Sequence, residues 1–161
     1  MVTRRTSSKP GATPQPRPCA TCPYRCSVPS GIWDAEEYAK LPEYDRDMGE
    51  QPVAAFYCHQ RDGSVCSGWL GHRDPYDLLA VRLGISAGHL DISCIEYETD
   101  VPLFQSGAEA AAHGMRDIRH PGRMAQKAID KIVAKRGEGF AEYCNECGKT
   151  GRHSYNCPHN H

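Results

Sequence analysis

The clearest amphipathic pattern in the sequence lies between residues 121 and 136. Apolar residues recur there at helical spacing, and they are Ala125, Ile129, Ile132 and Val133. Basic residues recur every four positions along a separate face, and they are Arg123, Lys127, Lys131 and Lys135. This pattern predicts a helix from about Pro121 to Arg136 with one buried face and one cationic face.

A shorter helix is predicted to begin at Asp34. Asp34 is a capping residue, and Glu37 stands three residues later, in the position that closes a capping box. Trp33 and Tyr38 flank this start at the spacing of a hydrophobic staple. Pro42 then ends the helix early, because proline cannot continue the hydrogen-bond ladder of a helix interior.

Two more helices are predicted in the middle of the chain. Pro75 sits at the first turn of one helix, and Gly84 ends it. Ser106 with Glu109 forms another capping box, which starts a helix that ends near Gly114.

A short apolar run from Val53 to Cys58 predicts a buried strand that carries Cys58 to the interior. The expected fold class is therefore α+β, a small metal-stabilised domain with short helices and few strands, plus a C-terminal module.

Composition divides the chain into four parts. Residues 1–18 are rich in Pro, Ser, Thr and Arg, which predicts a disordered basic tail, with order beginning at Cys19. A cysteine-rich metal-binding domain is expected over residues 19–136 and a linker over residues 137–142. Residues 143–161 form the separate C-terminal module.

Overall composition limits the size of the core and the class of protein. The 161 residues are 39% hydrophobic with a formal net charge of -1, yet they include nine cysteines and eight histidines. We find no secretory signal and no run of about 18 apolar residues, so we expect a cytoplasmic protein. In that reducing compartment cysteines serve as thiols or metal ligands, whereas export would favour disulfides. The cysteines are thus predicted to stabilise a domain with a thin core.

Charge is segregated along the chain. Residues 34–50 hold seven acids and two bases, and residues 115–136 hold seven bases and two acids. The predicted cationic helix face fits either the phosphates of a nucleic acid or the acidic segment. A face that is merely solvated is the remaining alternative.

The C-terminal module holds a regular set of ligand residues. They are Cys144, Cys147, His153 and Cys157, which resemble the ligands of a zinc knuckle in kind and order. The histidine comes one residue later than in that family, so His159 is an alternative ligand. Zinc knuckles bind single-stranded nucleic acid, and Lys149 and Arg152 are the basic residues that would contact it here. A tail with reactive thiols is the alternative.

The N-terminal half holds a less regular set of cysteines. A Cys-x2-Cys turn and a distant second pair are typical of a zinc site that cross-links two loops, and the predicted ligands are Cys19, Cys22, Cys58 and Cys66. Cys26 and His59 are alternative ligands, and Cys94 is expected to be a buried free thiol. A [4Fe-4S] cluster is the competing cofactor, because thiolates bind zinc and iron–sulfur clusters alike.

Four motifs surround these cysteines: PCATCPYR at 18–25, PSGIW at 29–33, FYCHQ at 56–60 and CSGW at 66–69. They resemble an uncharacterised cysteine-rich family, a domain of unknown function found in actinobacteria and their phages. The resemblance covers about residues 17–136. It implies that the four predicted ligands act as a unit, and it implies a phage or mobile-element origin. It implies no activity.

No catalytic residue is predicted. Cys58 and His59 are adjacent, and adjacent side chains on a strand point apart, so they do not form a thiol–base pair. We therefore expect a non-enzymatic protein with two zinc sites that binds nucleic acid or a host regulatory protein. A redox-sensing regulator with an iron–sulfur cluster is the alternative function.

Overall fold

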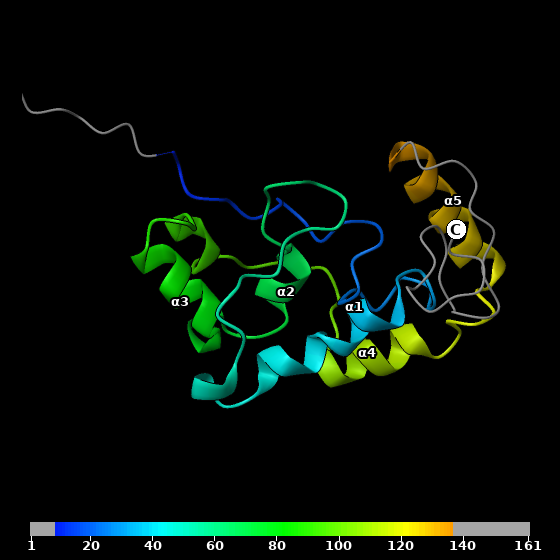
Figure 1. Cartoon of the computed structure of the whole chain (residues 1–161), viewed down its shortest axis with the longest axis horizontal. Coiled ribbons are helices and arrows are strands. Elements are labelled where there is room, and N and C mark those ends of the chain that lie inside the picture. Colours follow the sequence, from blue (N-terminus) through cyan, green and yellow to red (C-terminus); the bar gives the residue numbers. More distant parts are fainter. Residues whose placement is uncertain (1–8, 137–161) are drawn as a thin grey trace, which may run out of the picture.

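Short helices joined by long irregular connections make up the body of the molecule (Figure 1). The computed structural model describes residues 9–136. Five α-helices occur there: α1 Ala35–Ala39, α2 Ser67–Gly71, α3 Leu79–Ser86, α4 Gly107–Met115 and α5 Arg123–Arg136. Short 3-10 turns lie between them, at Leu41–Asp45, Met48–Glu50, Pro75–Asp77 and Ile92–Cys94.

The predicted strand from Val53 to Cys58 is wrong. Residues 9–136 form only isolated bridges, of which one joins Tyr57 to Val65 in the antiparallel sense. Two backbone hydrogen bonds hold this loop, from Cys58 to Ser64 and from Cys66 to Phe56. The pairing stops there because α2 begins directly after Cys66. The described domain is therefore mostly helical rather than α+β.

The core is built largely from aromatic rings around α2. Trp69 of α2 and Tyr24 are fully buried. Tyr44 packs edge-on against both Trp69 and Phe56, with ring centroids 5.2 and 5.8 Å apart respectively. Aromatic side chains bury much area per residue, so a few of them fill the centre of a chain with modest apolar content.

Helix α4 lies beside α1 on one side of the body, with α3 at the opposite end from α5 (Figure 1). Gly114 of α4 makes the close approach to α1 possible, because a Cβ at this position would overlap the ring of Tyr38. The predicted start of α4 is confirmed: the Ser106 hydroxyl accepts a hydrogen bond of 3.2 Å from the backbone N–H of Glu109.

A partly buried hydrogen bond between His72 and Asp45 joins the end of α2 to the segment after α1. His72 follows α2, and its Nε2 lies 2.7 Å from a carboxylate oxygen of Asp45. The other carboxylate oxygen of Asp45 accepts a hydrogen bond from the backbone N–H of Gly107, the first residue of α4. One carboxylate thus connects three segments that are distant in the sequence.

The helices predicted near Asp34 and Pro75 are present as α1 and α3, but the contacts of Glu37 in α1 and the end of α3 differ from the prediction. Helix α1 follows Asp34, but the Glu37 carboxylate pairs with Lys40 and His59. Gly84 does not end α3, which continues to Ser86; instead Gly84 gives room to the side chain of Leu90.

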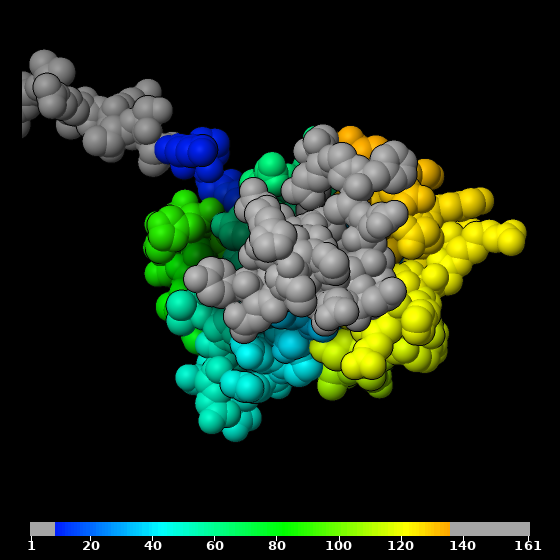
Figure 2. Space-filling model, turned by 45° about the vertical axis from the view of Figure 1, so that its right-hand side comes forward, coloured from blue at the N-terminus to red at the C-terminus, as the bar shows by residue number. Residues whose placement is uncertain are grey.

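The basic helix is confirmed as α5. Its predicted apolar residues Ala125, Ile129 and Ile132 are buried, and Val133 is half-buried. The residues of α5, drawn in orange, lie on the outer surface at one side of the body (Figure 2). Within residues 9–136, no helix is long and apolar enough to cross a membrane.

The chain is ordered before Cys19, contrary to the sequence prediction. Ala12 exchanges backbone hydrogen bonds with His89 and Asp91, and Val65 donates to the carbonyl of Thr13. An extended segment needs partners distant in the sequence for these bonds, and composition alone does not reveal them. The predicted linker and C-terminal module lie outside the described residues, so their ligands and basic residues stay predictions.

Candidate metal centre

The four cysteines predicted to form one site come together in the structure. The sulfur atoms of Cys22 and Cys66 lie 3.8 Å apart. The Cys19 thiol interacts with the thiols of both Cys22 and Cys58. The contacts are pairwise, and within residues 9–136 no three or more His, Cys, Asp or Glu side chains are placed together as a group that could hold a metal ion. The structure thus brings together cysteines up to 47 positions apart, from Cys19 to Cys66.

Tight turns present the first two thiols. The backbone N–H of Cys22 donates to the carbonyl of Cys19, and that of Arg25 donates to the carbonyl of Cys22. The Arg25 guanidinium reaches back and donates to the carbonyls of Pro18 and Cys19, at 3.3 and 3.4 Å respectively. Hydrogen bonds within the chain therefore hold the turn at both ends.

Backbone N–H groups point at three of the four sulfurs. The Cys19 sulfur accepts from the backbone of Thr21, and the Cys22 sulfur accepts from that of Tyr24. The Cys58 sulfur accepts from the backbone of Gln60 and of Arg61. Such hydrogen bonds favour the thiolate form, which is the form that binds metal.

Burial and some of the contacts between the thiols act in the opposite direction and raise the pKa values. The contact with Cys19 raises the pKa of Cys58 most, and burial raises it further. For Cys22, the contact with Cys19 lowers the pKa, but the contact with Cys66 and burial outweigh it, so its pKa lies well above the usual value. Four clustered thiolates therefore need a cation among them, because their negative charges repel one another in a buried place.

The close packing of this cluster requires glycine at position 68. A Cβ atom at Gly68 would overlap the sulfur of Cys22 and crowd the side chain of Tyr24. Our sequence predictions did not include Gly68. Its position in CSGW, two residues after a predicted ligand, is the only sequence signal for it.

The alternative ligands are placed differently. The His59 ring stacks on Trp33 with centroids 4.4 Å apart, and its Nε2 lies 2.9 Å from a carboxylate oxygen of Glu37. Cys26 is exposed, whereas Cys22, Cys58 and Cys66 are buried. Cys94 is buried as a free thiol, and burial is the main cause that raises its pKa to about 11.

A family model matches residues 14–136, which is most of the chain. The chain belongs to DUF6283, a family of unknown function. The match includes all four clustered cysteines, Gly68 and α5, and it ends before the C-terminal module. No curated protein and no solved structure matches the chain. Family membership therefore places the thiol cluster inside the DUF6283 domain and leaves its function to be argued from the site.

The basic residues predicted to bind nucleic acid divide into two groups on the DUF6283 domain. Lys127, Lys131 and Lys135 line a pocket next to Cys19, whereas Arg123 is exposed at the start of α5 and does not line it. The Nζ of Lys135 donates to the carbonyl of Gln60 at 3.0 Å, so α5 is bound to the loop after Cys58. The cationic face of α5 and the thiol cluster are therefore neighbours.

Proposed function

We propose that Cys19, Cys22, Cys58 and Cys66 bind one zinc ion. The distance between Cys22 and Cys66 supports this most directly. Zinc binds four thiolates tetrahedrally with Zn–S distances of about 2.3 Å, and a tetrahedron of that size has edges of about 3.8 Å. The 3.8 Å between these two sulfurs equals such an edge.

The same distance disfavours a four-iron cluster. In a [4Fe-4S] site each cysteine binds a different iron atom, so the four sulfurs must be spread around the whole cluster rather than around one ion. The pairwise contacts of the four thiols fit the separations of sulfurs around one ion better than those around a cluster. An iron–sulfur redox sensor is thus the second candidate function, and the colour of the protein distinguishes the two.

The proposed zinc ion has a structural role. Four cysteines would complete its coordination, so no open position would remain for catalysis. Three of them, Cys22, Cys58 and Cys66, are buried. The ion would join the N-terminal turn to both ends of the loop before α2. That bond supplies folding free energy to a domain with a small core.

We propose that the domain acts as a non-enzymatic binding module and that its partner is nucleic acid. The exposed lysines of α5 support this proposal: neither Lys127 nor Lys131 has an ion pair within residues 9–136. Phosphate groups bind such rows of ammonium groups with release of counterions. A host regulatory protein with an acidic surface is the other partner that this charge would suit.

The C-terminal module would add a second zinc ion and further basic contacts. Cys144, Cys147, Cys157 and either His153 or His159 are the proposed ligands, in the manner of a zinc knuckle. Lys149 and Arg152 are its proposed contacts to nucleic acid. A phage origin in actinobacteria stays a prediction from the sequence motifs.

Metal analysis of the purified full chain tests the proposal. We expect a colourless protein with about two zinc ions per chain, as two tetrahedral sites require. A brown protein with iron, acid-labile sulfide and absorbance at about 400 nm would refute the zinc assignment and support the redox sensor. Zinc with no binding to nucleic acid would refute only the binding role.

A further inference from the structure

A pocket of about 600 Å³ lies next to the thiol cluster, between α5 and the segments around Cys19 and Gln60. Its apolar lining includes Ile32, Met124, Ala128 and Ile132. Three lysines of α5 also line it, at positions 127, 131 and 135, and none of its lining residues is acidic. It is therefore an apolar pocket with a cationic edge.

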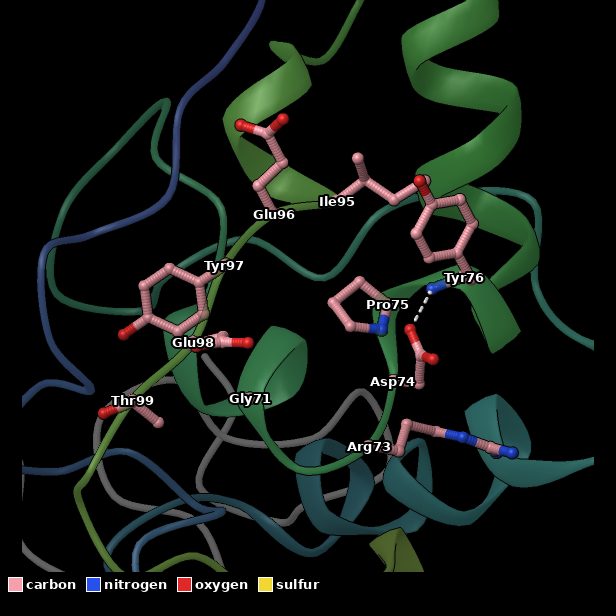
Figure 3. A pocket seen from close by; sticks show the side chains of 10 residues that line it. All are labelled: Gly71, Arg73, Asp74, Pro75, Tyr76, Ile95, Glu96, Tyr97, Glu98 and Thr99. Carbon is pink, nitrogen blue, oxygen red and sulfur yellow. Dashed lines mark hydrogen bonds between the residues drawn. The ribbon is translucent and has the colours of Figure 1, made fainter.

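Another pocket, with a volume of about 540 Å³, differs from this one in charge. That pocket is lined by Asp74, Glu96 and Glu98 against a single base, Arg73 (Figure 3). Of these two pockets, the one beside α5 is therefore the one whose charge favours an anionic ligand.

Two polar side chains that line the pocket beside α5 are bonded to each other. The amide nitrogen of Gln60 donates to the Thr21 hydroxyl at 2.8 Å, and both residues line the pocket. Met124 lies on α5 with 65% of its surface exposed. Because methionine is flexible and polarisable, it adapts to flat ligands of different shape.

We propose that this pocket takes an unstacked base of a single-stranded nucleic acid, with the neighbouring phosphates on Lys127 and Lys131. The inference rests on the proposed function, namely that α5 binds nucleic acid. A base has apolar faces, which match the aliphatic lining, and a polar edge, which the Thr21 hydroxyl and the Gln60 amide can bind. In a duplex the bases are stacked and paired, so a duplex reaches the lysines but not the pocket.

The charge of the proposed zinc site is compatible with this ligand. One zinc ion with four thiolates carries a net charge of about -2. Three ammonium groups line the pocket together with Cys19, so the edge of the pocket keeps a positive charge. The pocket holds no aromatic ring among its lining residues, so binding of the base would rest on apolar contact and on hydrogen bonds to Thr21 and Gln60.

Binding by the zinc-loaded full chain tests the inference. The probes are a fluorescent oligothymidylate of about 15 nucleotides, long enough for one binding site, and a duplex of the same length. The test variant is Ala128→Trp, which fills the pocket without changing charge. The control is Gln126→Trp, on the exposed opposite face of α5. Zinc content and circular dichroism show whether each variant is folded.

We expect Ala128→Trp to weaken binding of the single strand about tenfold, the effect of losing one base contact, and to leave duplex binding unchanged. Gln126→Trp should change neither. Ala128→Leu serves as a milder variant if Ala128→Trp loses its zinc, and a smaller loss in the same direction is expected.

If Ala128→Trp weakens binding of both probes equally, or does not weaken binding of the single strand, the proposal that a base binds in the pocket is refuted. The proposed nucleic-acid function would still stand. If neither probe binds the unmodified protein at low salt, the proposed binding function itself is refuted.

Discussion

Gly68 lies directly against the sulfur of Cys22, where any side chain would overlap it. The contact joins the first turn of α2 to the N-terminal Cys-x2-Cys turn, two parts of the proposed zinc site that are distant in sequence. Because a sulfur bound to the proposed zinc ion could not move aside, a methyl group at this position would have to displace either α2 or that ion.

We therefore expect Gly68→Ala to lower zinc affinity and to destabilise the protein by about 1–3 kcal/mol, the usual cost of overpacking. Zinc content and urea denaturation measure the two effects. Gly49→Ala is the matched control, since a Cβ at Gly49 meets no atom within 4 Å. A Gly68→Ala protein with full zinc and unchanged stability would show that the thiols do not hold a metal in this geometry.

Cys66→Ser tests the ligand set. Loss of one thiolate from a four-cysteine site should remove about one zinc ion per chain. Cys26→Ser should keep all its zinc, because Cys26 is exposed and lies outside the thiol cluster. The reverse pattern would mean that the chain uses Cys26 as a ligand in place of Cys66.

Removal of zinc by a chelator should unfold the described domain, because metal binding and folding are coupled when the core is small. The protein has two tryptophans, both buried, and the Trp33 ring nitrogen donates to the carbonyl of Thr21 within the Cys-x2-Cys turn at 2.8 Å. We expect the fluorescence maximum to shift to longer wavelength with chelator and to return with added zinc. An unchanged spectrum after complete zinc removal would contradict a structural role.

Asp45 predicts a pH dependence of stability. Burial raises its pKa, but hydrogen bonds from His72 and from the backbone of Gly107 outweigh burial and hold the pKa below its usual value of about 3.9. A lowered pKa in the folded state means that the carboxylate stabilises the protein above the unfolded pKa. That contribution is lost as the pH falls below about 4 and through the folded pKa.

Asp45→Asn should therefore cost about 1–3 kcal/mol at neutral pH, as expected for a partly buried, charged hydrogen-bond acceptor. The difference from the natural protein should shrink as the pH falls below about 4. Urea denaturation measures it at each pH at which both proteins stay folded, because loss of zinc in acid would unfold both. Asp47→Asn, at an exposed position, is the control. A difference that stays constant with pH would refute the role of the Asp45 charge.

Charge reversal at Lys127 and Lys131 should weaken nucleic-acid binding and reduce its salt dependence. Each lysine that contacts a phosphate adds about one unit to the slope of log affinity against log salt, so the slope should fall by about two. Reversing Lys9 and Arg82 changes the net charge equally at exposed positions outside α5. An equal effect of both pairs would mean that only net charge matters.

The sequence by itself determined the features that depend on neighbours a few positions apart. Helix α5 and its buried residues follow from apolar residues at helical spacing, and the start of α4 follows from Ser106 and its contact with Glu109. Cys19, Cys22, Cys58 and Cys66 also could be chosen from the sequence, because metal ligands come in recognisable pairs. The structure added the finding that these four thiols lie close together.

Only the tertiary structure decided the features that depend on distant partners. The segment from Val53 to Cys58 has the composition of a strand, but α2 begins where its partner strand would continue. Residues 9–18 look disordered by composition, yet they bond to segments around Val65 and His89. The need for glycine at position 68 follows from a sulfur 46 residues earlier in the chain. Local spacing governs helices and turns, whereas backbone pairing and close packing depend on which segments the fold brings together.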